Sequence, residues 1–111
     1  MKLFRKKRKK RVCVIGLDGV PFPLLKDLAH KNIMPHFSSL IQAGHLHKMK
    51  ASLPEISSVS WTDFMTGENS GTHGIFGFTD LKTNSYELRF PNFLEVKTEP
   101  LWDKLAKKGK K

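Results

Sequence analysis

The stretch VCVIGLDG, residues 12–19, decides the fold class of this 111-residue chain. Its first six residues form an almost unbroken apolar run with β-branched members, as expected of a parallel strand that is buried on both faces. Asp18 ends the run, and two nearby prolines oppose further strand pairing. The pattern predicts a central strand in an α/β fold, with Cys13 as a small core residue inside it.

Asp18 is the first candidate site residue. A carboxylate at the carboxyl end of a buried parallel strand points into the crevice where open α/β sheets bind ligands. Its hard oxygen atoms suit a divalent cation. Capping of the following helix is the alternative role for Asp18.

A second stretch, LPEISSVSWTDFMTGENSGTHGIFGF (residues 53–78), places a cluster of serines at the start of a helix. Ser57, Ser58 and Ser60 precede apolar side chains that are spaced as one face of a helix. A serine in this position can cap the free backbone N–H groups. Alternatively, a phosphate attached to it can use the same donors and the positive end of the helix dipole.

Short motifs follow one another here in a specific order. They are Pro54, Ser57, Thr66-Gly67 and His73-Gly74-Ile75. Together with residues 12–19, this order resembles the alkaline phosphatase superfamily, in its type I phosphodiesterase/nucleotide pyrophosphatase branch. The resemblance covers residues 12–111. It implies a doubly wound, mostly parallel sheet with flanking helices, of which only the N-terminal part is present.

The resemblance also implies a site and a reaction. Ser57 takes the place of the nucleophile of a metal-dependent phosphohydrolase, and Asp18 and Ser57 take the places of metal ligands. Two divalent cations, zinc or manganese, would activate Ser57 in the complete enzyme and lead to a phosphoserine intermediate. Ser58 and Ser60 are expected to bind the phosphate of a phosphate ester substrate. His73 is expected to be a hydrogen-bonded turn residue rather than a ligand.

One part of the motif departs from the eukaryotic-type pattern. Those relatives follow the nucleophile with Phe-Pro-Asn-His, whereas residues 58–61 of this chain read SVSW. Ser60 offers a hydroxyl with a shorter reach in place of the asparagine. The run from Trp61 to Gly67 is more similar to the prokaryotic phosphohydrolase/phosphomutase branch, so specificity for nucleotides is not implied.

The basic composition belongs to the two ends of the chain. The formal net charge is +10, and of the 20 Lys and Arg residues eight lie in residues 1–11 and five in residues 104–111. All ten acidic residues lie between these segments. Residues 1–11 are therefore expected to form a solvated basic tail. The alternative function is a non-catalytic module that binds anionic surfaces or nucleic acid, although no specific nucleic-acid module accompanies the tail.

The remaining patterns predict further elements. Helices are expected at residues 22–31, 34–43 and 100–108, a strand around residues 46–52, and a hairpin at residues 79–90. His45 and His47 would share one face of that strand, as a solvated pair or as a two-histidine metal pair. No apolar segment approaches the length of a membrane span and no signal cleavage site is found, so a cytoplasmic location is expected.

The domain of this family is several times longer, and its later segments bring the remaining metal ligands. No such ligand set follows Ser57 in this sequence. We therefore expect residues 12–111 to be the N-terminal part of a truncated catalytic domain that is inactive alone. A separately encoded C-terminal portion is one potential partner, and an inert fragment is the other interpretation.

Overall fold

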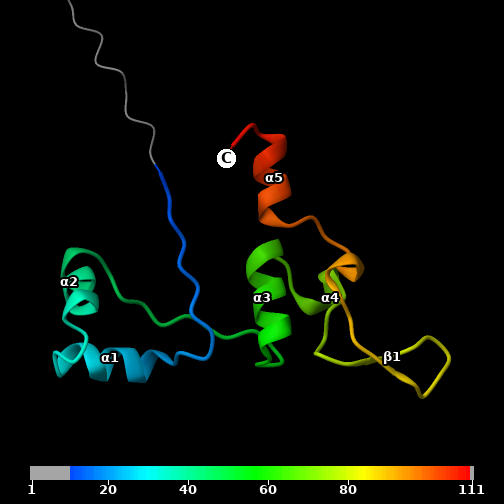
Figure 1. The fold of residues 1–111 in the computed structure, drawn as a ribbon, viewed down its shortest axis with the longest axis horizontal. Helices are drawn as coiled ribbons and strands as arrows, with labels where there is room; N and C mark the ends of the chain where they lie inside the picture. Colours follow the sequence, from blue (N-terminus) through cyan, green and yellow to red (C-terminus); the bar gives the residue numbers. More distant parts are fainter. Residues whose placement is uncertain (1–10, 111) are drawn as a thin grey trace, which may run out of the picture.

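The computed structural model of the protein describes residues 11–110, which form mostly short helices. The elements are α1 (Phe22–His30), α2 (Pro35–Ala43), α3 (Ser57–Thr66), α4 (Ser70–His73), β1 (Asp80–Leu81), β2 (Leu88–Arg89), the 3-10 helix η1 (Phe93–Glu95) and α5 (Leu101–Lys107). Helix α1 packs on α2, and α3 packs on both α4 and α5. Figure 1 shows that the α1–α2 pair stands apart from the group around α3, joined to it by long segments without secondary structure.

The α1–α2 pair confirms two of the predicted helices. Pro35 is the first residue of α2 and Gly44 follows its last, the positions that proline and glycine favour at helix ends. Helix α1 is followed by Asn32, two residues past its last residue, in the left-handed region at φ 54°, where an asparagine is tolerated. The Ser38 hydroxyl then donates to the carbonyl of Ala29 at 2.9 Å, which ties the second helix to the first.

Helix α3 carries the buried part of the structure. Val59 is fully buried, and only Ala29, Val59 and Ile75 are buried apolar residues within residues 11–110. Helix α3 ends at Gly67, whose φ of 75° favours glycine. Lys104 of α5 donates its ammonium to the Thr66 carbonyl at 3.0 Å, a favourable place for a cation at the end of a helix.

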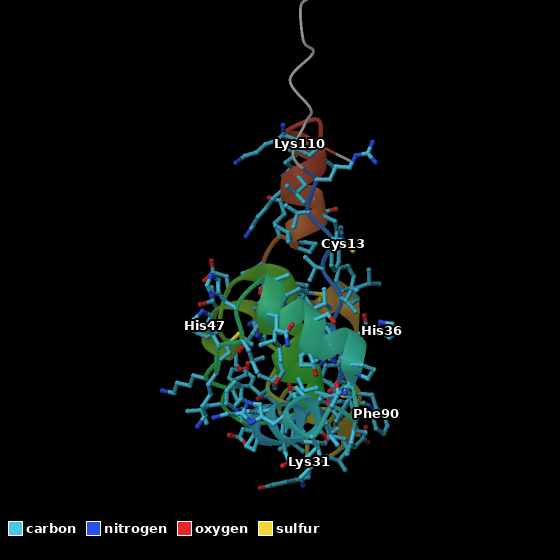
Figure 2. All side chains as sticks on the ribbon, turned by 90° about the vertical axis from the view of Figure 1, so that its left-hand side faces the viewer. Cys13, Lys31, His36, His47, Phe90 and Lys110 are labelled. Carbon is cyan, nitrogen blue, oxygen red and sulfur yellow. The ribbon has the colours of Figure 1, made fainter. Side chains whose placement is uncertain are left out.

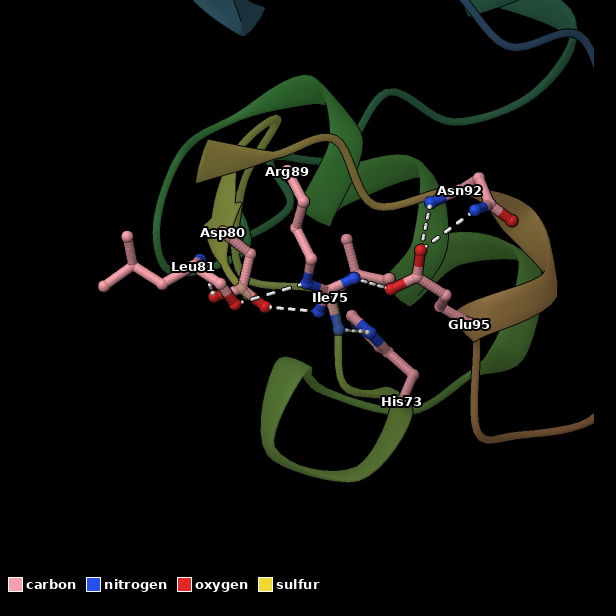
Figure 3. Close-up of polar contacts among 7 residues, drawn as sticks. All are labelled: His73, Ile75, Asp80, Leu81, Arg89, Asn92 and Glu95. Atoms are coloured by element: carbon pink, nitrogen blue, oxygen red, sulfur yellow. Dashed lines mark hydrogen bonds and ion pairs between the residues drawn. The ribbon is translucent and has the colours of Figure 1, made fainter. Parts of the chain in front are cut away.

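The predicted hairpin is confirmed as two very short antiparallel strands. Asp80 pairs with Arg89 in β1 and β2, and the turn closes through a hydrogen bond from Ser85 to Lys82 at 3.1 Å. The Arg89 guanidinium forms ion pairs with Asp80, at 2.6 Å, and with Glu95 of η1. Figure 3 shows how these contacts join the hairpin to the 3-10 helix.

The predicted parallel sheet is absent from residues 11–110. Residues 12–17 form no strand and are exposed, so the prediction of a buried strand is wrong for this structure. Cys13 is exposed as well, and its predicted core role is also wrong. A parallel strand needs hydrogen-bonded neighbours and helices over both faces of its sheet. The only sheet among the described residues is the β1–β2 pair, so helices with a small antiparallel sheet are consistent with an incomplete α/β domain.

The strand expected around residues 46–52 is wrong for the same reason. That segment has no secondary structure, and the Met49 side chain is 86% exposed. Without a neighbouring strand, its apolar residues have no sheet on which to pack.

The described chain is much less compact than a complete domain. Its radius of gyration is 19.7 Å, against about 13 Å for a compact chain of this length. Figure 2 shows the labelled side chains of Cys13, His36, His47 and Phe90 at the periphery. Within residues 11–110 no helix is long and apolar enough to cross a membrane. The basic tail predicted for residues 1–11 falls outside the described residues except for Arg11, which is exposed.

Candidate active site

Asp18 and Ser57 lie together although 39 residues separate them in sequence. The Ser57 hydroxyl donates to Oδ1 of Asp18 across 3.2 Å. The carboxylate is exposed and the serine is half-buried. The structure thus confirms that the two residues are close. Their expected place at the edge of a parallel sheet is not shown, because no such sheet is present in residues 11–110.

Neither residue acts as a helix cap. Helix α3 has Ile56 at its N-cap position, with no side-chain capping bond, and Ser57 is its first helical residue. Helix α1 has Pro21 at its N-cap position, also without a side-chain capping bond, so Asp18 does not cap it. Both capping alternatives are therefore wrong. The two polar side chains instead face each other.

The start of α3 offers free backbone donors next to this pair. The N–H groups of Val59 and Ser60 donate to the Ile56 carbonyl at 3.0 and 2.9 Å. The N–H groups of Ser57 and Ser58 have no acceptor within the part of the chain that the structure describes. Free N–H groups and the helix dipole together favour an anion at this end of a helix.

The hydroxyl groups of Ser58 and Ser60 are placed differently. Successive residues on a helix are separated by about 100° around its axis, so Ser58 points away from Ser57. The Ser58 Oγ is buried without a hydrogen-bond partner. Ser58 lines a cavity of about 260 Å³ whose other residues include Trp61 and Phe78 but neither Asp18 nor Ser57. Ser60 is half-buried and lies about 60° from Ser57, on the side of the helix nearer to the pair.

His73 is a buried residue whose two nitrogens are both occupied. Its Nε2 lies 2.6 Å from Oδ1 of Asp63, and its Nδ1 accepts from the N–H of Ile75 at 3.0 Å. These partners require a neutral ring with its proton on Nε2. Figure 3 shows the contact between the ring and Ile75. The expected hydrogen bonding of His73 is confirmed, although the residue is the last of helix α4 rather than part of a turn, and neither nitrogen is free to bind a metal.

The oxygen atoms of Asp18 and Ser57 are of the type that a divalent cation prefers, but they are too few for a complete site. A carboxylate and a hydroxyl provide hard oxygen ligands. The ion pairs found within residues 11–110 do not include Asp18, so no Lys or Arg there neutralises it. The described residues contain no cluster of three or more His, Cys, Asp or Glu side chains that could hold a metal ion. By itself the pair would supply only two ligands, fewer than a divalent cation usually takes.

His45 and His47 lie close together at the surface of the described structure. Their ring centroids lie 5.8 Å apart and the rings are tilted by 34°. Both side chains are exposed. No third ligand joins them among the described residues, so the geometry favours the solvated pair.

Gly16 is a residue near the site that the sequence reasoning missed. Its backbone lies directly against the indole ring of Trp61, one helical turn beyond Ser57. The signal in the sequence was a glycine inside an otherwise apolar run, because a glycine there often marks a close approach by another group.

A family model described as type I phosphodiesterase / nucleotide pyrophosphatase matches residues 12–111 of the chain. The match spans α1 to α5 and includes both Asp18 and Ser57. No curated protein and no solved structure matches the chain.

Proposed function

This chain belongs to the type I phosphodiesterase / nucleotide pyrophosphatase family, and from that premise we propose that it carries the nucleophile half of a phosphoric ester hydrolase site. The observation that supports this proposal is the 3.2 Å contact between the Ser57 hydroxyl and the Asp18 carboxylate. Ser57 is the proposed nucleophile. Asp18 is the proposed cation ligand and the hydrogen-bond partner of Ser57. The pair lies at the N-terminus of α3, the end of a helix that favours anions.

The proposed reaction begins at the Ser57 oxygen. Oγ forms a bond to the phosphorus of a phosphate ester, and the hydroxyl proton leaves toward Asp18, to which it is already donated. The bond between phosphorus and the ester oxygen breaks, and that oxygen departs with the electron pair and takes a proton from solvent. A water molecule then attacks the phosphorus and releases a proton to solvent, the bond between phosphorus and Oγ breaks, and the phosphate product leaves. Oγ takes back the proton held by Asp18, which restores the Ser57 hydroxyl.

Asp18 and Ser57 are the residues that would hold a divalent cation, zinc or manganese. Such a cation, when bound, supplies a Lewis acid that favours the serine alkoxide and offsets charge on the phosphoryl group. A second cation is part of the same proposal, and the described residues contain no group of three or more side chains that could hold it. The two oxygen atoms of this pair fall short of the usual ligand set of either ion.

The phosphoryl oxygens are proposed to bind at the first turn of α3. The free N–H groups of Ser57 and Ser58 are the donors nearest the nucleophile. Ser60 adds its hydroxyl from the neighbouring side of the helix. Ser58 takes part through its backbone N–H, because its own Oγ is buried elsewhere.

We further propose that the complete site needs ligands from beyond residues 12–111, from a continuation of the domain or from a separate C-terminal portion. The many exposed apolar side chains of the described residues support this, since large exposed apolar patches mark surfaces that contact other groups. In isolation the chain is expected to react slowly at Ser57 and not to turn over. The alternative role of the basic tail, as a module for anionic surfaces, concerns residues outside the described part of the chain.

Capture of a phosphate on Ser57 tests the proposed function. The chain is incubated with an aryl phosphate monoester and zinc or manganese, quenched in acid, and mapped by peptide mass spectrometry. We expect slow, substoichiometric phosphorylation of Ser57, lost in Ser57→Ala and Asp18→Asn. The matched control is Ser39→Ala, because the exposed Ser39 hydroxyl only donates to Pro35 within its own helix. Phosphate on Ser58 or Ser60, or none on Ser57, would contradict the proposal.

A further inference from the structure

The segment that carries Asp18 touches α3 at a second point, where Gly16 lies against the indole of Trp61. We propose that this contact is a positioning device that sets the approach of Asp18 to Ser57. The inference rests on the proposed function of that pair. Gly16 and Trp61 touch no substrate in this account and act only through the residues that they place.

The contact requires a residue without a side chain at position 16. A Cβ atom built on Gly16 would lie 2.7 Å from Cζ3 of Trp61 and still closer to Cη2. Real Cβ contacts under 3.0 Å are essentially never seen. Any other residue would therefore push the segment away from the helix, or push the indole aside. The indole is a bulky group on a helix, and it leans edge-on against Phe64 with ring centroids 5.9 Å apart.

The two contacts are in register with each other. Gly16 and Asp18 are two residues apart on the segment, which is about 6.6 Å along an extended chain. Their partners Trp61 and Ser57 are four residues apart on α3, which is about 6 Å along a helix and places them on one face. Because Gly16 meets the later residue and Asp18 the earlier one, the segment runs antiparallel to the helix. A shift at Gly16 therefore moves Asp18 along the helix as well.

The hydrogen bond alone is a weak tether. Asp18 is exposed, so water competes for its carboxylate. Residues 12–17 belong to no strand in the described structure, and no sheet holds them. The Gly16–Trp61 contact is thus a second, non-polar point of attachment for the segment. With both contacts the orientation of the segment on α3 is fixed, whereas the hydrogen bond alone would let the Asp18 carboxylate change its position.

The single cysteine of the chain allows a direct test. Cys13 is exposed and lies on the same segment, so it can carry a nitroxide label in the full chain. Paramagnetic broadening of the Ser57 and Trp61 amide signals then reports how closely the segment lies against α3. We expect strong broadening in the parent chain, and its loss in Gly16→Ala and in Trp61→Leu. The double variant should recover it, because leucine leaves room for the alanine methyl.

Gly77→Ala is the matched control, since a Cβ there meets its nearest atom at an ordinary 3.5 Å. It should keep the broadening of the parent. Unchanged broadening in Gly16→Ala would overturn the proposal. A double variant that loses as much broadening as the two single variants together would overturn it as well. If Gly16→Ala also loses the amide signals of α1 and α2, the chain has unfolded. The Trp61→Leu variant then tests the positioning role instead. Unchanged broadening at Ser57 in Trp61→Leu then overturns the proposal.

A second measurement separates this inference from the proposed function. Manganese ion alone is titrated into each unlabelled chain, and its affinity is measured from the broadening of the Asp18 and Ser57 signals. The affinity should fall at least about tenfold in Gly16→Ala, as for other residues that orient a ligand, and recover in the double variant. Equal affinity in all variants overturns the positioning role. If the parent binds no manganese at this pair, the proposed function fails, while the label measurement still decides whether Gly16 places the segment.

Discussion

Nε2 of His73 lies 2.6 Å from Oδ1 of Asp63 and fastens the short helix α4 to the middle of α3. The imidazole is fully buried, and its other nitrogen accepts from the Ile75 N–H. Helix α3 also presents Ser57 at its first turn. The C-terminal end of α3 is joined to α5 by the hydrogen bond from Lys104 to the Thr66 carbonyl. The site helix is therefore held by contacts that lie away from the proposed chemistry.

Replacing His73 should destabilise this group of helices. His73→Ala removes a buried ring and two hydrogen bonds and leaves Asp63 and the Ile75 N–H without partners, which costs about 3 kcal/mol. Urea unfolding followed by α-helical circular dichroism would measure the free energy. The control is His36→Ala, since His36 is exposed and should have a small effect. Equal losses in the two variants would show that the buried ring does not hold the helices.

The isolated chain should show little or no turnover of phosphate esters. Asp18 and Ser57 supply only part of one cation's ligand set, and no further ligand cluster is present among the described residues. Hydrolysis of an aryl phosphate mono- or diester with zinc or manganese is followed by the release of the phenol. Metal-dependent turnover that disappears in Ser57→Ala would show that the site is already complete. Activity that is equal in both proteins would indicate a contaminant.

A pH effect is expected at the C-terminal helix. The Glu99 carboxylate beside Lys107, at 2.8 Å, raises the pKa of that ammonium through a hydrogen bond and through its charge. Because the folded-state pKa is raised, the stabilisation is fully present at neutral pH and is lost as the pH rises through that pKa. Glu99→Gln should lower the pKa of Lys107 toward 10.5. A titration of the Lys107 side chain by NMR would measure it, and an unchanged pKa in the variant would contradict the pairing.

Exposed apolar surface should make the chain associate. Trp102 is 50% exposed on α5 and Ile15 is 81% exposed in the N-terminal segment, with few buried apolar residues to balance them. Large exposed apolar patches mark surfaces that bind other molecules or that cause association. Light scattering coupled to size-exclusion chromatography should show a mass that increases with concentration. A strictly monomeric chain at all concentrations would contradict this expectation.

The sequence predicted local elements better than long-range ones. Pro35 and Gly44 mark the two ends of α2 through their own backbone preferences, and the hairpin follows from its turn residues, so neighbours in sequence are sufficient. A buried parallel strand is different. The apolar run of residues 12–17 indicates a strand only if other strands flank it, and residues 11–110 contain none that do.

The candidate site divides in the same way. The proximity of Asp18 and Ser57 was expected from the order of the motifs and is found in the structure. The separate direction of the Ser58 hydroxyl follows from the helix angle, once the helix is known to begin at Ser57. The contact between Gly16 and Trp61 was not predicted, because Trp61 is 45 positions later and only folding shows that they meet. A lone glycine indicates a close approach but not the group that approaches.

The central claim, that Asp18 and Ser57 form one cation-binding pair at a nucleophile, is tested most directly by manganese broadening of the amide signals of the full chain. We expect broadening that is centred on residues 17–19 and 57–58, is abolished in Asp18→Asn and is weakened in Ser57→Ala. Asp27→Asn is the matched control, because Asp27 is an exposed aspartate that pairs with Lys31 on α1. Broadening that persists in Asp18→Asn, or that is centred on the acidic residues near Arg89, would contradict the account.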